Sequence, residues 1–343
     1  MDRVYGGMGW SESENESKQV GGGCFLIRQQ QTDRFGKTVR YDSLAPHSSR
    51  RYSVIMTVAV DEVASKSEPA KVTVRTLRKW VRADQKIPML TCYDATTAAW
   101  LWRGGVRCML VGDTAAQMML GYDSTLPVPL SFMLHITAAV RRGAPDAFVM
   151  ADMPFGSYQA NEDRAVANAM RFIKTASADV VKLEVDSSFA PLVERLTRAG
   201  VPVVAHLGSR PQQVRAEGGY RAVGRTRTEA AELIDTAELM IQRGAAMLLL
   251  EAVPAEVSQM VVDLAERTSG RSEPVPVIGC GGGPACHGHI VVLHDLLGLS
   301  DWQPPFARPV SDLGQQIAAT AAKWAELVES GRYLLDDHPY KMK

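Results

Sequence analysis

Acidic and imidazole side chains stand where one apolar run after another comes to an end in this sequence. The six polar residues at these ends are Asp94, Asp113, Asp152, Glu184, His206 and Glu251. If the runs are parallel strands, their carboxyl ends meet at one edge, and carboxylates gathered there repel one another unless a cation neutralises them. Mg²⁺ suits such a site, because it takes one or two carboxylates together with waters and substrate oxygens. The pattern predicts metal-assisted chemistry on a small oxyacid, although each acid has an alternative role as the N-cap of the following helix.

The elements that must position these residues alternate regularly from Thr73 onward. Short runs rich in Val, Ile, Leu and Met lie at residues 87–94, 108–113, 148–153, 179–184, 201–207, 246–251, 275–279 and 289–295. Their continuous apolar character is typical of strands covered on both faces, and helix-like stretches separate them. Eight such units in about 270 residues predict an α/β fold, a closed (β/α)8 TIM barrel. The alternative, an open doubly wound sheet, favours a GxGxxG turn after its first strand, where this chain has "TCYDATTAAW".

Residues 1–72 differ in composition from the rest of the chain. They are rich in Ser, Gln, Arg and Gly, and they show no sustained helical or strand period. We expect a disordered N-terminal extension ahead of a barrel catalytic domain at 73–343, with a functional arm as the alternative. A further hypothesis is that translation starts at Met56. Mass spectrometry of natively expressed protein would reject it if peptides upstream of Met56 were found.

Composition excludes several classes of partner. The chain has 343 residues, with 38 Lys and Arg against 38 Asp and Glu, and this balance argues against nucleic-acid binding and against a polybasic membrane contact. No apolar run reaches the roughly 18 residues that span a bilayer. The first 20 residues lack the apolar core of a secretory signal, and the five cysteines are scattered and odd in number. We therefore expect a cytoplasmic protein in a reducing compartment.

Several longer segments carry a family resemblance. The segments "TCYDATTA", "MLVGDTAAQMMLGYDSTLPV", "ADMPFGSY", "VVKLE", "VPVVAHLGSRPQQV", "GGYRAVGR" and "LLLEAVPAEV" occur in order within residues 73–335. Together they resemble the 3-methyl-2-oxobutanoate (ketopantoate) hydroxymethyltransferase family. The resemblance implies a barrel of the phosphoenolpyruvate/pyruvate-domain type that forms a homo-oligomer, often a decamer. It also implies transfer of a hydroxymethyl group from 5,10-methylenetetrahydrofolate to 3-methyl-2-oxobutanoate, giving 2-dehydropantoate for pantothenate and coenzyme A biosynthesis.

The resemblance also implies a metal site. Asp113 in "VGDT" and Asp152 in "ADMPF" look like ligands of Mg²⁺ that also face the substrate, and Glu184 in "VKLE" looks like the third acid, acting directly or through water. A metal bound to the carboxylate and keto oxygens of the 2-oxo acid would stabilise the enolate formed at C3 as a Lewis acid.

Four further residues take substrate and catalytic roles by the same resemblance. Thr114, where the family usually has Ser, keeps a hydroxyl for the substrate carboxylate, and Lys182 looks like the cation that pairs with the 2-oxo acid. Lys182 and Glu184 are two apart, so on a strand they share a face. His206 looks like a further substrate contact. Glu251 resembles the general base, with a capping or surface acid as its alternative.

The chain departs from the family pattern in several places. The changed positions are Ile136 beside His135, Val185 and Asp186 after Glu184, Cys280 in "GCGGG", and His287 and His289 in "CHGH". Cys286, His287, His289 and His294 invite a zinc interpretation. We favour its absence, because His289 and His294 are expected near opposite ends of one strand.

These departures leave two alternatives to the hydroxymethyltransferase. One is a Mg²⁺-dependent 2-oxo acid lyase or mutase on the same barrel, which the "DSTLPV" and "GGYRAVGR" segments disfavour. The other is a catalytically impaired paralogue, suggested by the altered "CHGH" segment.

Overall fold

The computed structural model describes residues 14–20, 24–32, 38–46, 70–267 and 274–333. The chain divides into two compact units, Met1–Pro69 and Ala70–Lys343. In the first unit, β1 (Glu14–Val20), β2 (Cys24–Thr32) and β3 (Thr38–Pro46) form an antiparallel sheet in the order β1-β2-β3.

This small sheet differs from the expectation of no regular structure before residue 73. The polar sequence of Glu14–Val20 shows no alternation, and the pairing of β2 with β3, from Cys24 with Pro46 to Thr32 with Thr38, joins backbone groups whatever the side chains are. The remaining residues up to Pro69, Met56 included, lie outside the described residues, so disorder there stays a prediction.

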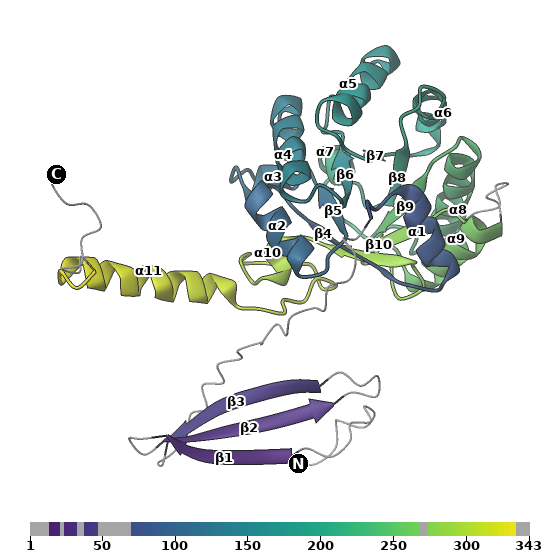
Figure 1. The fold of residues 1–343 in the computed structure, drawn as a ribbon. Coiled ribbons are helices and arrows are strands. Elements are labelled where there is room, and N and C mark those ends of the chain that lie inside the picture. The colour runs from purple at the N-terminus through teal and green to yellow at the C-terminus, as the bar shows by residue number, and fades with distance from the viewer. Residues whose placement is uncertain (1–13, 21–23, 33–37, 47–69, 268–273, 334–343) are drawn as a thin grey trace. The chain divides into compact units, whose positions relative to one another are not determined.

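The second unit is a closed parallel barrel of eight strands, as predicted (Figure 1). The strands are β4 (Ile87–Thr91), β5 (Cys108–Val111), β6 (Phe148–Asp152), β7 (Val180–Glu184), β8 (Val203–Gly208), β9 (Met247–Glu251), β10 (Val277–Cys280) and β11 (Gly288–Val291). Each of the eight apolar runs overlaps one of these strands. The barrel closes where β11 pairs with β4.

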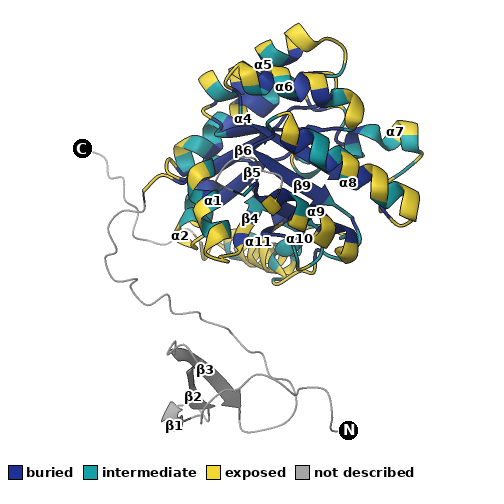
Figure 2. Ribbon diagram, turned by 90° about the vertical axis from the view of Figure 1, so that its right-hand side faces the viewer, coloured by how far each residue is buried: buried dark blue, intermediate teal, exposed yellow. Residues whose placement is uncertain are grey.

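The helices of this unit mostly pack around the barrel with buried inner faces and exposed outer faces, but α11 has no such buried face (Figure 2). They are α1 (Val74–Arg82), α2 (Ala95–Arg103), α3 (Ala115–Met118), α4 (Leu130–Gly143), α5 (Glu162–Lys174), α6 (Ala190–Arg198), α7 (Val214–Glu217), α8 (Arg227–Gln242), α9 (Ala255–Arg267), α10 (Leu293–Leu296) and α11 (Leu313–Glu329), with 3₁₀ turns at Ser187–Phe189 and Pro211–Gln213. No residue of α11 is buried. Assembly into a homo-oligomer stays a prediction. Within the described ranges, the helices are too short or too polar to cross a membrane.

Alternate strand residues fill the barrel interior, and their chemistry changes along its axis. One apolar cluster contains alternate strand residues from the amino-terminal half of the barrel, among them Phe148, Met150 and Val180. The next residues of the same alternation are Asp152 on β6 and Lys182 and Glu184 on β7. Because side chains two apart on a strand share a face, the apolar floor gives way to a polar mouth at the carboxyl ends.

Gly143 at the end of α4 tests the close packing of the outer helices. A Cβ at this position would lie 2.1 Å from the backbone oxygen of Ala95 in α2. We expect Gly143→Ala to lower the free energy of unfolding by about 1–3 kcal/mol in urea denaturation, since backbone must move. Gly104→Ala is the control, because its Cβ would meet no atom nearer than 3.4 Å. Equal stabilities of the two variants would contradict this packing.

Candidate active site

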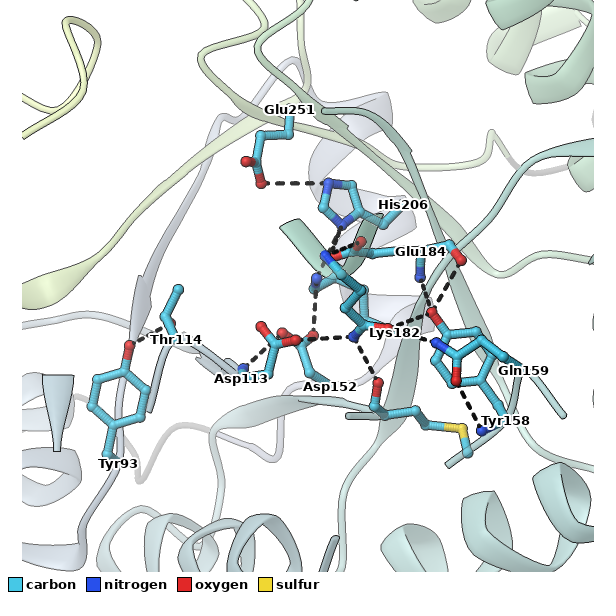
Figure 3. Close-up of polar contacts among 12 residues, drawn as sticks. Tyr93, Asp113, Thr114, Asp152, Tyr158, Gln159, Lys182, Glu184, His206 and Glu251 are labelled. Atoms are coloured by element: carbon cyan, nitrogen blue, oxygen red, sulfur yellow. Dashed lines mark hydrogen bonds and ion pairs between the residues drawn. The ribbon is translucent and has the colours of Figure 1, made fainter. Parts of the chain in front are cut away.

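All seven predicted site residues line one small chamber at the carboxyl ends of the strands. The chamber has a volume of about 60 Å³, and the seven are Asp113, Thr114, Asp152, Lys182, Glu184, His206 and Glu251. Figure 3 shows the charged and imidazole side chains gathered together, with Thr114 beside them and bonded to Tyr93. Glu251 is the most open of the charged and imidazole side chains, with 23% of its side chain exposed, whereas Lys182 is 6% exposed.

Asp94, the remaining polar residue at a run end, has the plainer role. Its carboxylate accepts hydrogen bonds from the backbone N–H of Thr97 at 2.9 Å and from the Thr97 hydroxyl at 2.6 Å. Asp94 is therefore the N-cap of α2, and it takes no part in the chamber.

Lys182 places one ammonium at the centre of the cluster. Its Nζ lies 3.0 Å from Asp152 Oδ1 and 3.1 Å from His206 Nδ1. Burial by itself would lower the pKa of Lys182, but the carboxylates of Asp152, Asp113 and Glu184 outweigh it and raise the pKa above its ordinary value. The lysine is therefore charged, and it is held by the acids rather than by solvent.

His206 connects this lysine to Glu251. An ammonium has no acceptor, so Nδ1 of His206 accepts from Lys182 and the ring proton sits on Nε2, which lies 3.4 Å from Glu251 Oε2. Burial and the charge of Lys182 lower the pKa of His206. The ring is neutral, and its Nε2 lies beside the carboxylate that resembles the general base without forming a hydrogen bond of good geometry to it.

The acids of the cluster outnumber its ammonium group. Burial and the carboxylate of Asp152 raise the pKa of Asp113 to about 7, and burial and Asp113 raise the pKa of Glu184 well above its usual range. Such shifts show that the full negative charge is poorly compensated by Lys182. A divalent cation would relieve it.

The donor set fits Mg²⁺ better than it fits an ion that needs many protein ligands. Among the described residues, no three His, Cys, Asp or Glu groups are placed to hold one ion directly. Mg²⁺ commonly uses one or two carboxylates and completes its octahedron with waters and substrate. Asp113 and Asp152 offer carboxylates of this kind, and Glu184 lines the same chamber.

Sequence reasoning missed Gln212, which lies in the 3₁₀ turn after β8. Its side-chain amide donates to Asp113 Oδ2 at 2.9 Å, and its backbone N–H donates to Glu184 Oε2 at 2.9 Å. Tyr93 was also missed. Its hydroxyl lies 2.7 Å from Thr114 Oγ1, so the Thr114 hydroxyl is oriented by a buried phenol.

A second, larger cavity of about 1090 Å³ adjoins the chamber. Glu251, Thr114 and Cys280 line both spaces, so the carboxylate of Glu251 stands where the two meet. The outer cavity is lined by aromatic and basic side chains, among them Tyr220, Trp302, Phe306, Arg221 and Arg225.

Most departures from the family pattern lie away from the chamber lining. Ile136 is buried in the core, and His135 contacts Ser131 of its own helix, α4. Asp186 caps the 3₁₀ turn after β7 and pairs with Arg210 at 2.7 Å. Cys280 is the exception, since it lines both cavities.

The histidine-rich segment is structural. His287 precedes β11, where its Nδ1 accepts from the backbone N–H of Val277 at 3.0 Å and its Nε2 lies 3.2 Å from Glu266. The expectation that His289 and His294 share a strand was wrong, because β11 ends at Val291 and His294 lies in α10. The strand stops early because α10 begins directly after Val292.

A parallel (β/α)8 barrel with acids, a charged lysine and a neutral imidazole at its carboxyl-terminal mouth defines a barrel enzyme. The model of the ketopantoate hydroxymethyltransferase family matches residues 71–334. The chain belongs to this family, as its motifs predicted.

Curated relatives agree with this assignment, and a solved structure shares the fold. The 3-methyl-2-oxobutanoate hydroxymethyltransferase of Ignicoccus hospitalis is 41% identical over 263 residues, which cover 77% of this chain and 97% of that one. The enzyme of the same name from Syntrophus aciditrophicus is 38% identical over 279 residues, covering 81% and 100%. A crystal structure of 2,3-dimethylmalate lyase, a member of the PEP mutase/isocitrate lyase superfamily, superposes with a TM-score of 0.51 at 16% identity, covering 79% and 92%. That likeness shows the fold alone and gives the lyase or mutase alternative no support.

The raised pKa of Asp113 makes a prediction about stability without metal. A carboxyl with a folded-state pKa of about 7, above its usual 3.8, contributes stability at low pH that is lost as the pH rises through 7. In EDTA at pH 8, Asp113→Asn should therefore raise the Tm, by about 3–8 °C at the usual 2–4 °C per kcal/mol. The gain should vanish near pH 4.

Asp152→Asn is the matched comparison for this experiment. It removes the carboxylate 3.0 Å from the Lys182 ammonium, so it should lower the Tm at both pH values. If the Tm of Asp113→Asn at pH 8 were below that of the wild type, this would contradict the raised pKa assigned to Asp113.

Proposed function

We propose that the protein transfers a hydroxymethyl group from 5,10-methylenetetrahydrofolate to 3-methyl-2-oxobutanoate, giving 2-dehydropantoate. The observation that carries the proposal is the position of Glu251, at the junction between the charged chamber and the large outer cavity. A base at this junction reaches a substrate held in the chamber and faces a one-carbon donor bound outside it. The names of the relatives support the same reaction.

Mg²⁺ would be held by Asp113 and Asp152, with Glu184 acting through water. When bound, it supplies a Lewis acid for the carboxylate and keto oxygens of the 2-oxo acid. The buried and poorly compensated carboxylates support this part of the proposal.

The chain's own residues supply the remaining groups. The ammonium of Lys182 stabilises negative charge that develops on the keto oxygen, and the Thr114 hydroxyl, fixed by Tyr93, donates to the substrate carboxylate. Glu251 removes the proton from C3. His206 Nε2 lies 3.4 Å from Glu251 Oε2, close enough to donate to that carboxylate once a bound substrate brings the two into line.

The outer cavity suits the folate. Aromatic side chains such as Tyr220, Trp302 and Phe306 offer faces for a flat pterin ring. Arg225 offers charge for the glutamate carboxylates, and Arg221, which also lines the cavity, already pairs with Glu229 at 2.8 Å. The substrate C3, which lies next to Glu251 at the junction of the two cavities, would then face the one-carbon unit of the folate.

The impaired-paralogue alternative receives no support from the altered segment. His287 precedes the first residue of β11, at the amino-terminal end of the barrel, and it does not line either cavity. The changes in "CHGH" therefore leave the proposed chemistry untouched.

Exchange of the C3 proton tests the proposal one step at a time. With Mg²⁺ and 3-methyl-2-oxobutanoate in D₂O, the wild type should exchange the C3 proton without folate, as followed by NMR. Glu251→Gln should slow this exchange by about 10²–10⁴-fold, the usual contribution of a positioned base. Adding 5,10-methylenetetrahydrofolate should then convert the substrate into 2-dehydropantoate.

His287→Asp serves as the control, since it alters the segment away from the chamber and should leave exchange unchanged. Absence of exchange in the wild type would contradict the enolisation, and exchange that survives in Glu251→Gln would contradict the choice of base.

A further inference from the structure

Gln212, in the 3₁₀ turn beside the cluster, uses the whole hydrogen-bonding capacity of its side chain. Its Nε2 donates to Asp113 Oδ2 at 2.9 Å and to the backbone oxygen of Met153 at 3.0 Å. Its Oε1 accepts from the Tyr158 hydroxyl and from Gln159 Nε2, both at 2.8 Å. An amide has two donors and two acceptor positions, so these four bonds fix which end faces Asp113.

The surroundings of Gln212 make this arrangement rigid. Gln212 and Tyr158 are both buried, and the Tyr158 hydroxyl also accepts from the backbone N–H of Glu184 at 3.1 Å. Pro211 precedes Gln212 in the 3₁₀ turn and restricts the backbone there. The amide cannot turn away from Asp113 without leaving buried partners unsatisfied.

Each of the three acids has one oxygen already taken by an N–H donor. Gln212 supplies two of these donors, its side chain to Asp113 Oδ2 and its backbone to Glu184 Oε2. The backbone N–H of Asp113 supplies the third, to Asp152 Oδ2 at 3.0 Å. Asp113 and Glu184 are thus each left with one oxygen for a cation, whereas the other oxygen of Asp152 faces the ammonium of Lys182 at 3.0 Å. A carboxylate with one oxygen held by an N–H donor presents its other oxygen to a cation, which favours monodentate ligation.

We propose that Gln212 is a positioning residue that makes this site select Mg²⁺ over Ca²⁺. A small octahedral cation is satisfied by monodentate carboxylates and waters, whereas Ca²⁺ takes six to eight oxygens and gains from bidentate carboxylates. By holding Asp113 Oδ2 with an N–H donor, Gln212 disfavours the use of that oxygen in a bidentate contact, from which the larger ion would gain. The inference rests on the Mg²⁺ site of the proposed function and adds the group that sets its selectivity.

Competition for bound Mn²⁺ tests the proposal without measuring turnover. Free Mn²⁺ is followed by electron paramagnetic resonance while Mg²⁺ or Ca²⁺ displaces the bound ion from the full-length protein. In the wild type, Mg²⁺ should displace Mn²⁺ at a lower concentration than Ca²⁺ does. Gln212→Met, which keeps the length of the side chain but has no amide, should lower the Mg²⁺-over-Ca²⁺ ratio about tenfold, the usual effect of losing a group that orients a ligand.

Gln159→Met is the matched control. It removes one bond to Gln212 Oε1 but leaves the Tyr158 hydroxyl as a donor to that oxygen and the bond to Asp113 in place, so the ratio should stay at the wild-type value. If Gln212→Met does not fold, Gln212→Asn replaces it, because the shorter amide cannot reach both Tyr158 and Asp113. A folded Gln212 variant with the wild-type ratio would overturn the proposal.

The outcomes separate this proposal from the one on which it rests. Bound Mn²⁺ with an unchanged ratio in the Gln212 variants overturns the role of Gln212 alone. Absence of bound Mn²⁺ in the wild type overturns the metal site itself, and the selectivity proposal with it.

Discussion

One ammonium buried among carboxylates is the interaction on which the rest of the site depends. Lys182 is held 3.0 Å from Asp152, with Asp113, Glu184 and Glu251 close enough to raise its pKa. Neutral His206 adds no charge, so the cluster carries more negative than positive groups. Burying such an excess is costly unless each group is held in place by hydrogen bonds and a further cation is bound. Gln212, in the turn after β8, donates such bonds to Asp113 and Glu184, and the phenol of Tyr158 holds the Gln212 amide in place.

The barrel makes this cluster possible by changing chemistry along its strands. Phe148, Met150 and Val180 form an apolar floor, and Asp152 and Lys182 follow in the same alternation. The floor excludes water beneath the charges, which strengthens the electrostatic interactions within the mouth. Glu251 is the partly exposed member of the cluster, and it lines both the buried chamber and the larger outer cavity. The proposed base therefore lies between the two cavities.

The sequence predicted the strands and the inward acids, because continuous apolar runs and period-two spacing are local signals. It could not separate Asp94 from Asp113, since each ends a run and precedes a helix, and contacts in the folded chain alone show that Asp94 caps α2. Gln212 was missed for a similar reason: its partner Asp113 lies 99 residues away, and nothing near it in the chain marks the contact. The sequence also misplaced His294. The apolar run "HIVVLHD" gave no sign that the strand ends at Val291 and that α10 begins at Leu293.

The central claim is that the buried acids are held ready for a divalent cation, and proton release on metal binding tests it most directly. Metal-free protein is titrated with Mg²⁺ at pH 7 by calorimetry in two buffers that differ in ionisation enthalpy. Because the pKa of Asp113 is about 7 without metal, binding should release about half a proton or more per Mg²⁺. Saturable binding with the same heat in both buffers, or no saturable heat at all, would contradict the account.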